Sequence, residues 1–365
     1  MNIDLEVKKV SQTYENIIAT SILVIISVLI CFFSSKEPVY QPAYLMKKEI
    51  TLSSDIEVKG SKTVVISFTG DTTLGSDENF GYTNTFHEYY DKYGKEYFLK
   101  NVKHIFEKVD YTVFNLEGPL TNEGERADKE YAYKGRPEYI EILKEASVNA
   151  VNLANNHVKD YGNQGFIDTK QYLDEANIAY FENNTRHIAT IKDQTFAFLG
   201  YGIWIDSVAQ RNQIKNDIEQ MKKQADVVIV TIHGGDMDIN YPNDLLQLTA
   251  RHIIDSGADI VIGHHPHTIQ SIEKYKDKYI AYSIGNFLYG GSTSAYNSDT
   301  IILNVNFIFS DNSLTDIKLD IIPASISGTK NINNYQPVIL KDEAYKRVID
   351  KINLYSKDYN FYYSN

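Results

Sequence analysis

Short apolar runs rich in β-branched residues recur along the chain, and each run precedes a polar turn and a longer amphipathic stretch. Continuous apolar runs are typical of strands buried on both faces, and their alternation with helical patterns predicts an α/β fold. The expected strands are residues 63–69, 111–116, 149–154, 195–200, 226–232, 259–263 and 279–285. The expected helices lie near residues 96–108, 137–146, 163–176, 209–224 and 243–256.

The pattern changes after about residue 298, where TIILNVNFIF and SLTDIKLDII alternate apolar and polar positions. Consecutive alternating runs predict antiparallel strands at the edge of the sheet. A helical pattern follows over residues 343–359. We therefore predict one α/β domain, residues 62–325, with a C-terminal helical extension, residues 326–365, packed on it.

Residues 16–35 read NIIATSILVIISVLICFFSS and carry no charge. A helix of this length spans roughly 30 Å, about the thickness of the hydrocarbon core of a membrane. The alternatives are a cleaved signal peptide, a buried core helix and lipidation at Cys31. The run ends in Cys31-Phe32-Phe33 instead of a small-residue cleavage site, and Ile30 is bulky where a lipoprotein signal has a small residue. We predict an uncleaved transmembrane anchor.

The predicted anchor divides the N-terminal part into a short cytoplasmic tail, residues 1–15, the anchor itself, and a tether, residues 36–61. Lysines flank the anchor on both sides, so the distribution of positive charge does not fix its orientation. The single cysteine of the chain lies in the anchor, and a domain without cysteine is compatible with an oxidising exterior. We therefore expect a single-pass membrane protein whose N-terminus is cytoplasmic and whose domain is extracytoplasmic.

The composition narrows the function classes. There are 36 Lys and Arg against 48 Asp and Glu, which gives a formal charge of −12. An acidic chain is a poor partner for nucleic acid, because binding to the phosphate backbone depends on clustered Lys and Arg. With a single cysteine, outside the predicted domain, any metal ion must be held by His, Asp, Glu and Asn.

Ligand-type side chains follow five of the expected strands. In an open α/β sheet, functional groups collect at the carboxyl ends of the strands. Each residue alone also has a structural explanation, such as a helix cap at Asp71, a tight turn at His233 or an ordinary loop at Asn156. Three histidines in the four residues 264–267 are harder to explain by packing. The residues at the strand ends are Asp71, Glu117, Asn156, His157, His233, His264, His265 and His267.

Mixed oxygen and imidazole ligands without thiolate suit one or two divalent ions of Mn, Fe, Zn or Mg. Two such ions can hold a phosphoryl or acyl oxygen and activate a water, so the pattern predicts metal-assisted hydrolysis or transfer. Lys134 and Arg136 in YKGRP are the predicted binding residues for an anionic substrate. A solvated loop at a helix entry explains these two residues equally well.

Several motifs together resemble the bacterial CapA family of capsule or poly-γ-glutamate biosynthesis proteins, whose domain is similar to calcineurin-like metallophosphoesterases. They occur in the family's order and span about 220 residues. The motifs are FTGDTTLG (68–75), NLEGPLT (115–121), VNLANNHVKDYG (151–162), DSGADIVIGHHPHTIQ (255–270) and AYSIGNFLYG (281–290).

The resemblance implies an αββα metallophosphoesterase-like sandwich behind a membrane anchor, and it implies a membrane-bound synthase and export complex as partners. It assigns His157 and His264 to catalysis, although His264 also fits a supporting position. The expected substrate is an anionic polymer such as poly-γ-glutamate. The residues that it assigns to metal binding are Asp71, Glu117, Asn156, His233, His265 and His267.

Two departures from the family pattern bear on this assignment. Metallophosphoesterases usually open with Asp-x-His, whereas Asp71 is followed by Thr72 and Thr73, so one metal site lacks a ligand. The usual His-Trp-Gly motif is His233-Gly234-Gly235 here, which leaves open whether Asp236 or Asp238 supplies the acidic group that follows it. Three functions remain: a membrane-anchored hydrolase or transferase, a non-catalytic polymer-binding or scaffolding subunit, and a soluble cytoplasmic phosphoesterase.

Overall fold

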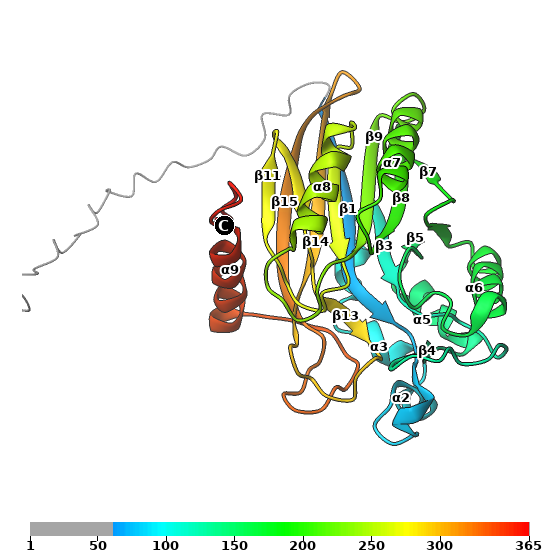
Figure 1. The fold of residues 1–365 in the computed structure, drawn as a ribbon. Helices are drawn as coiled ribbons and strands as arrows, with labels where there is room; N and C mark the ends of the chain where they lie inside the picture. The colour runs from blue at the N-terminus through cyan, green and yellow to red at the C-terminus, as the bar shows by residue number, and fades with distance from the viewer. Residues whose placement is uncertain (1–60, 365) are drawn as a thin grey trace, which may run out of the picture. The chain divides into compact units, whose positions relative to one another are not determined.

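Two β-sheets face each other at the centre of the computed structural model, which describes residues 61–364 (Figure 1). The larger sheet has the order β16-β15-β14-β1-β3-β5-β6, and β13 also pairs with β1. Strands β1, β3, β5, β6 and β13 run parallel, whereas β14, β15 and β16 continue the sheet in antiparallel fashion. Its strands are β1 (Ser61–Thr73), β3 (Tyr111–Leu116), β5 (Ala150–Asn152), β6 (Ala179–Phe181), β13 (Asn286–Tyr289), β14 (Asp299–Ser310), β15 (Ser313–Ser325) and β16 (Val338–Ile339).

The smaller sheet has the order β11-β12-β10-β9-β8-β7. Its four inner strands are parallel, and β11 and β7 are antiparallel edges. A separate pair joins β2 (Ser76–Asp77) to β4 (Tyr133–Lys134). The strands of the smaller sheet are β7 (His187–Ile191), β8 (Gln194–Ile203), β9 (Val227–Gly234), β10 (Ile260–His264), β11 (Ile272–Tyr275) and β12 (Lys278–Ala281).

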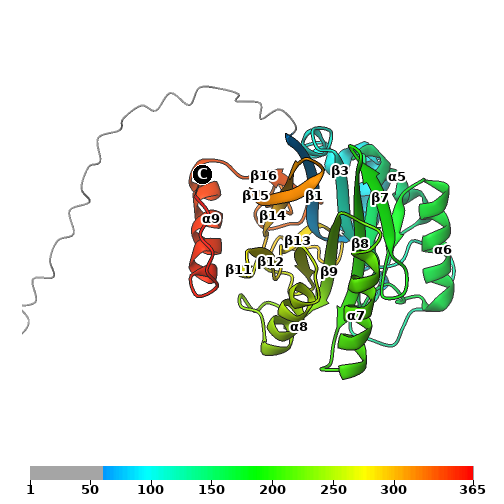
Figure 2. The same ribbon diagram turned by 90° about the horizontal axis from the view of Figure 1, so that it is seen from above.

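Helices cover the outer face of each sheet, as the view in Figure 2 shows. On the larger sheet they are α2 (Phe86–Tyr93), α3 (Glu96–Leu99), α4 (Lys103–Phe106), η2 (Pro137–Tyr139), α5 (Ile140–Glu145) and α6 (Gly162–Glu175). The short 3-10 helix η1 (Glu78–Phe80) follows β2 and buries none of its residues. On the smaller sheet they are α7 (Val208–Met221) and α8 (Asp244–Asp255). Side chains cap both of these helices, because Ser207 and Asn243 accept hydrogen bonds from backbone N–H groups of the first turn.

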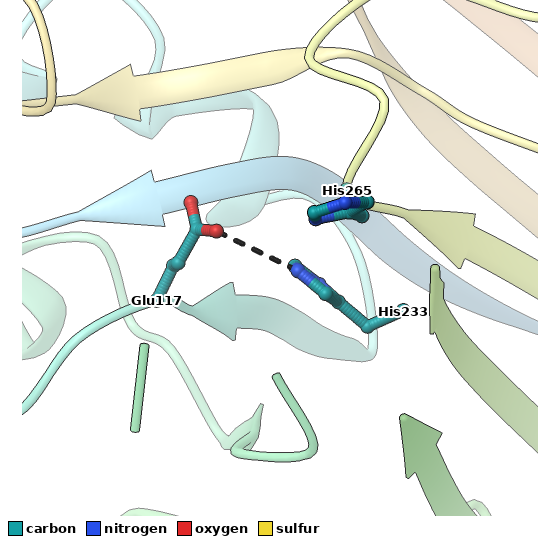
Figure 3. A group of neighbouring side chains, drawn as sticks. All are labelled: Glu117, His233 and His265. Atoms are coloured by element: carbon teal, nitrogen blue, oxygen red, sulfur yellow. Dashed lines mark ion pairs between the residues drawn. The ribbon is translucent and has the colours of Figure 1, made fainter. Parts of the chain in front are cut away.

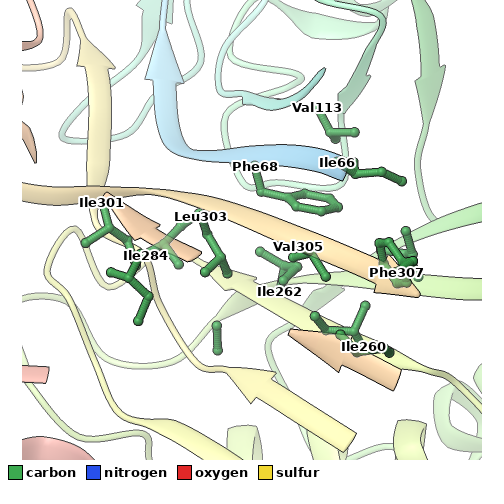
Figure 4. Close-up of a cluster of buried hydrophobic side chains, with 14 of the residues drawn as sticks. Ile66, Phe68, Val113, Ile260, Ile262, Ile284, Ile301, Leu303, Val305 and Phe307 are labelled. Carbon is green, nitrogen blue, oxygen red and sulfur yellow. The ribbon is translucent and has the colours of Figure 1, made fainter. Parts of the chain in front are cut away.

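Alternate residues of each central strand point to different cores. Ile66 and Phe68 of β1 lie between the two sheets together with Ile260 and Ile262 of β10 (Figure 4). Val261, between the last two, packs instead against α7 and α8. Because side chains of a strand alternate between the two faces, strands covered on both sides must be apolar throughout. This requirement is the physical origin of the continuous apolar runs.

The C-terminal helix α9 (Asp342–Ser356) packs beside β11 and β15. Val348 and Ile352 join the core between the sheets, and Lys351 forms an ion pair with Asp299 at the start of β14. Arg347 makes a two-pronged contact with the same carboxylate. The predicted limits of the domain and of its C-terminal extension stay predictions.

The predicted α/β class is confirmed, and the expected strands and helices recur with small shifts of their ends. The helix expected over residues 96–108 is two short helices, α3 and α4, and the strand expected over 279–285 ends at Ala281. Within residues 61–364, no helix combines the length and the apolar character that a membrane crossing needs. The predicted tail, anchor and nearly all of the tether lie outside the described residues.

Candidate metal centre

The ligand-type side chains of the sequence motifs meet where parallel strands of both sheets end. Asp71 lies near the end of β1, Glu117 directly follows β3, and His157 lies in the loop after β5. The opposite sheet contributes His233 near the end of β9 and His264 at the end of β10. The exposed fraction of each of these side chains is 6% or less. The strand order therefore brings residues far apart in the chain to one buried point.

One group that could hold an ion consists of Glu117, His233 and His265, whose ligand atoms all lie within 4.8 Å of one another. The three side chains point toward one another in Figure 3, and His233 Nε2 lies 3.5 Å from Glu117 Oε1. A carboxylate with two imidazoles is a common ligand set for borderline divalent ions.

Asn156 adds an amide oxygen to this group. Its Oδ1 lies 2.9 Å from Nε2 of His233. On the other side of the ring, Nδ2 of Asn115 lies 3.3 Å from Nδ1 of His233. Since an amide nitrogen can only donate, Nδ1 accepts and Nε2 carries the proton that Asn156 accepts. An ion at Nε2 would replace that proton and could contact the Asn156 oxygen as well.

A second group consists of Asp71, Glu117 and His267, again with ligand atoms within 4.8 Å. Nδ1 of His267 lies 3.3 Å from Oδ2 of Asp71 and 2.8 Å from Oδ1 of Asn286. Glu117 belongs to both groups, so its carboxylate lies between two adjacent places for an ion. A carboxylate has two oxygens and can serve two ions at once.

Three buried polar atoms support the fit to a cation. Oε1 of Glu117, Nδ1 of His264 and Nδ1 of His265 have no hydrogen-bond partner among the described residues. Buried acceptors without a partner are costly and rare in folded proteins. Two of the three belong to the first group, Glu117, His233 and His265, so a divalent ion would satisfy them.

Hydrogen bonds hold the Asp71 carboxylate in place. Asn115 Nδ2 donates to its Oδ1 at 2.7 Å, and the backbone N–H of His265 donates to its Oδ2 at 3.2 Å. Burial alone would raise the pKa of Asp71, but contacts with His264 and His267 hold that pKa well below its usual range. Burial and the charge of Asp71 instead raise the pKa of Glu117.

The histidines have different proton affinities. Burial lowers the pKa of His233 well below its ordinary value, and burial with the charge of His267 lowers the pKa of His265 to about 4. Burial would also lower the pKa of His267, but the hydrogen bond to Asp71 and the charge of Glu117 raise it to about 9. At neutral pH, His233 and His265 are therefore neutral, as metal ligands must be.

The backbone after β10 is strained where it presents its imidazoles. His265 has a φ of 99° and His267 a φ of 56°. Residues other than glycine rarely adopt such positive φ angles. Such conformations cost free energy and are found mostly at functional sites. Here the turn directs two histidines of one short segment into two adjacent ligand groups.

His157 has a fixed orientation beside the centre. Its Nδ1 lies 2.6 Å from Oδ2 of Asp160, so Nδ1 donates to that carboxylate. Nε2, on the other side of the ring, lies 3.9 Å from Oε1 of Glu117. Lys129 Nζ donates to the other oxygen of Asp160 at 2.7 Å. Asp160 thus fixes the tautomer and the ring orientation of His157.

An open pocket of about 600 Å³ adjoins the centre. His157 and His267 line it together with Tyr133 and Tyr289. Its remaining wall consists of aromatic, amide, hydroxyl and acidic residues together with Met237 and Gly291. Glu130 and Asp238 are its carboxylates, and no Lys or Arg lines it. Its lining residues are Phe80, Glu130, Tyr131, Tyr133, His157, Met237, Asp238, His267, Asn286, Tyr289, Gly291, Ser292, Thr293, Tyr296 and Asn297.

Lys134 and Arg136 do not line this pocket. Lys134 lies over the ring of Tyr161, with its Nζ 4.2 Å from the centroid. Arg136 donates to both oxygens of Asp91, at 2.5 and 2.9 Å, so its planar fork already has a carboxylate partner. Their role in substrate binding stays a prediction.

Thr73 and Asp238, at the two positions where the sequence departs from the family pattern, both lie beside the centre or its pocket. Where the pattern has histidine, Thr73 donates from Oγ1 to Oε2 of Glu117 at 3.2 Å and so orients the shared carboxylate. Asp238 lines the pocket, whereas Asp236 does not. Asp238 is therefore the better placed of the two to meet a substrate.

Several residues of the site have no strong sequence signal. Asn115 donates to Asp71 and accepts from Nδ2 of Asn152 at 2.7 Å, which forms a buried amide chain across β1, β3 and β5. Trp204, the single tryptophan of the chain, packs edge-on against His265 at 5.1 Å between ring centroids. Asp160 lies in the motif VNLANNHVKDYG, three residues after His157. This short spacing is the sequence signal that could have identified it as a partner of His157.

Together, the facing sheets and the buried cluster define an α/β protein with a candidate metal centre at the carboxyl ends of its parallel strands. The chain belongs to the family described as bacterial capsule synthesis protein PGA_cap, which residues 65–290 match. The predicted membership of the CapA capsule and poly-glutamate family is thus confirmed. The quoted motifs and all of the candidate ligands lie within the matched residues.

Three relatives have names that concern capsule or polymer synthesis. The capsule biosynthesis protein CapA of Bacillus anthracis is 31% identical in an alignment of 267 residues that covers 66% of this chain and 64% of the relative. The PGA biosynthesis protein CapA of Bacillus subtilis is 34% identical in an alignment of 218 residues that covers 54% of this chain and 57% of the relative. A probable polyglutamine synthesis accessory protein of Mycobacterium tuberculosis is 27% identical in an alignment of 212 residues that covers 49% of this chain and 55% of the relative.

The matched region therefore spans less than two thirds of each of these relatives. Among solved structures, a hypothetical protein from Thermus thermophilus is similar with a TM-score of 0.46 and 14% identity. That likeness covers 71% of this chain and 99% of the other.

Proposed function

We propose that this chain is a metal-dependent hydrolase or transferase, with a metallophosphoesterase-like site, that acts in the synthesis, export or anchoring of a poly-γ-glutamate capsule. The observation that carries the proposal is the pair of buried ligand groups sharing Glu117, within a region that matches a capsule synthesis family. The expected ions are Mn, Fe or Zn, because imidazole with carboxylate suits these borderline metals better than Mg.

The residues of the site would have two roles, metal binding and proton exchange. Glu117, His233 and His265 would hold one ion, and Asp71 and His267 with Glu117 would hold a second, weaker one. A bound divalent ion would supply positive charge that polarises a phosphoryl or acyl oxygen. His157 would exchange a proton at Nε2, because Asp160 holds the proton of its Nδ1.

The same proposal includes anchoring by residues 16–35 and an extracytoplasmic domain that works beside the membrane-bound synthase. The support is the uncharged run in the sequence and the names of the relatives, one of which is an accessory protein of polymer synthesis. Recovery of the full chain in the soluble fraction of lysed cells would contradict the anchor.

The test uses the full chain purified from membranes in detergent. Its Mn²⁺ affinity is measured by calorimetry, and its activity is measured on a phosphodiester panel and on poly-γ-glutamate. His233→Ala is expected to lower the Mn²⁺ affinity by more than about 100-fold and to abolish hydrolysis, since loss of a ligand exceeds the usual effect of losing a supporting group. His104→Ala removes an exposed histidine of α4 and is the matched control, expected to change neither.

A second function is a non-catalytic subunit that binds polymer or organises the synthase. The observation that favours it is Thr73, which occupies the position of an expected ligand and leaves the second group with three residues. Under this alternative, the wild type binds metal weakly or not at all, hydrolyses neither substrate, and the His233→Ala variant restores capsule as well as the wild type does.

A further inference from the structure

Two tyrosine hydroxyls meet in the wall of the pocket. Tyr133 comes from β4 and Tyr289 from the end of β13, and their hydroxyl oxygens lie 3.2 Å apart. Both side chains are buried, with 3% and 8% of their surface exposed. Tyrosines so deeply buried usually have a partner for the hydroxyl, and here each is the partner of the other.

The two rings also contact the imidazoles of the centre. The ring of Tyr133 lies 4.4 Å from that of His157, and the ring of Tyr289 lies 5.2 Å from that of His267. The hydroxyl pair is thus connected by direct packing to the proposed proton-exchanging residue and to a proposed metal ligand. All four residues line the same pocket.

One of the two hydroxyl groups has an O–H that donates to no acceptor in the described part of the protein. One hydroxyl donates to the other, and the accepting hydroxyl keeps its own proton. Among residues 61–364, neither hydroxyl oxygen makes another hydrogen bond. A phenol has an ordinary pKa of about 10, so both protons are present at neutral pH. An acceptor for the second proton can therefore come from a molecule in the pocket.

The position of the pair is fixed by close packing with a glycine. A Cβ on Gly291 would lie 2.5 Å from Cζ and 2.6 Å from the hydroxyl oxygen of Tyr289. It would also lie 2.8 Å from Cζ of Tyr133. A side chain at position 291 would clash with both rings. Gly291 therefore lets the backbone of its loop pack directly against Tyr133 and Tyr289.

We propose that Tyr133 and Tyr289 form an uncharged donor pair that binds an oxygen of an oxyanion substrate, a carboxylate or a phosphate, beside the metal centre. The proposal rests on the proposed function and names how its substrate is recognised. Because the pocket wall contains no Lys or Arg, an anion there depends on the ion and on neutral donors. Donors held rigidly in a buried wall are suited to this task, because they need no reorganisation when the substrate binds.

The test measures binding of inorganic phosphate and of glutarate to the Mn²⁺-loaded full chain by calorimetry. Tyr133→Phe and Tyr289→Phe each remove one hydroxyl and keep the ring, so the Mn²⁺ affinity is expected to stay unchanged. Binding of the anion is expected to weaken by about three- to tenfold, the usual contribution of one neutral hydrogen bond. Weakening with phosphate alone identifies a phosphoryl group, and weakening with glutarate alone identifies a carboxyl group.

Tyr296→Phe is the matched control, because Tyr296 lines the same pocket but is 81% exposed. Gly291→Ala should weaken anion binding although both hydroxyls are present. The inference is overturned if both Phe variants bind each anion within about twofold of the wild type, well under one hydrogen bond. It is also overturned if the Mn²⁺-loaded wild type binds neither anion.

Failure of this inference can be told apart from failure of the proposed function. If the wild type hydrolyses a substrate while both Phe variants keep full anion affinity, the tyrosine pair is not the donor and the function stands. If the anions bind through the tyrosines and no substrate is hydrolysed, the donor pair stands and the enzymatic function fails.

Discussion

His267 is positively charged in the metal-free protein, whereas it would have to be neutral to bind an ion. Its pKa is about 9 because Asp71 and Glu117 outweigh the effect of burial. A histidine whose pKa rises on folding stabilises the fold fully below its unfolded value of about 6.5, and that stability is lost as the pH rises through 9. The metal-free protein should therefore lose stability on the alkaline side.

We expect the free energy of unfolding of the chelated chain to fall by about 3 kcal/mol between pH 6.5 and pH 9.5, the equivalent of a shift from 6.5 to 9. Urea unfolding at a series of pH values, with a chelator present, measures this. His267→Asn keeps a polar side chain without the charge and should flatten the alkaline slope. An equal slope in this variant would assign the effect to other groups.

At the same scale, the sequence predicted the site residues that protrude at strand ends and missed those that support them. Asp71, Glu117 and His233 were predictable as a group, because ligand-type side chains follow several strands whose carboxyl ends meet, although each residue alone also has a structural explanation. Asn115 lies within an apolar run, and its contact with Asp71 depends on the pairing of β3 with β1. The partners of Arg136 depend likewise on α2, which the hydrophobic pattern did not reveal.

At the scale of elements, close approaches between strands set the geometry of the centre. A Cβ on Gly70 of β1 would lie 2.0 Å from the carbonyl oxygen of Gly285, just before β13. The next residue, Asp71, donates its backbone N–H to that same oxygen at 3.0 Å. Only a residue without a side chain permits this approach.

Gly70→Ala should therefore push β13 away from β1 and displace Asp71. We expect a loss of at least about 3 kcal/mol in the free energy of unfolding, at the upper end for overpacking, because backbone atoms cannot move aside. Chemical denaturation of the metal-free chain measures the loss. Gly328→Ala is the control, since its nearest neighbour would be Asn334 Nδ2 at 3.4 Å. Equal stability of the two variants would contradict the proposed clash.

The central strands were predictable at this scale, and the peripheral elements were not. Long runs such as β8 and β9 are buried on both faces, so their composition alone identifies them. Strands of two or three residues, such as β2, β4 and β16, exist only because a partner is nearby. Their hydrogen bonds are set by tertiary structure, and no pattern in the local sequence specifies them.

For the whole molecule, the net charge of −12 opposes the approach of a polyanion. No Lys or Arg lines the pocket, whose carboxylates are Glu130 and Asp238. Its charged imidazole, His267, is a candidate ligand that would have to lose its proton to hold an ion. Attraction of an anionic polymer therefore falls to the ion and to local donors.

The ligand groups take Asp71 and Glu117 from one sheet and His233, His265 and His267 from the other. A bound ion would thus cross-link the two sheets at their rim, where the apolar core between them ends. Mn²⁺ at 100 times its dissociation constant should raise the free energy of unfolding by about 2.7 kcal/mol. Amide hydrogen exchange should slow at the ends of β3 and β9 together, and slowing in one sheet alone would contradict the cross-link. Metal supply would then govern how long the protein survives as well as what it can do.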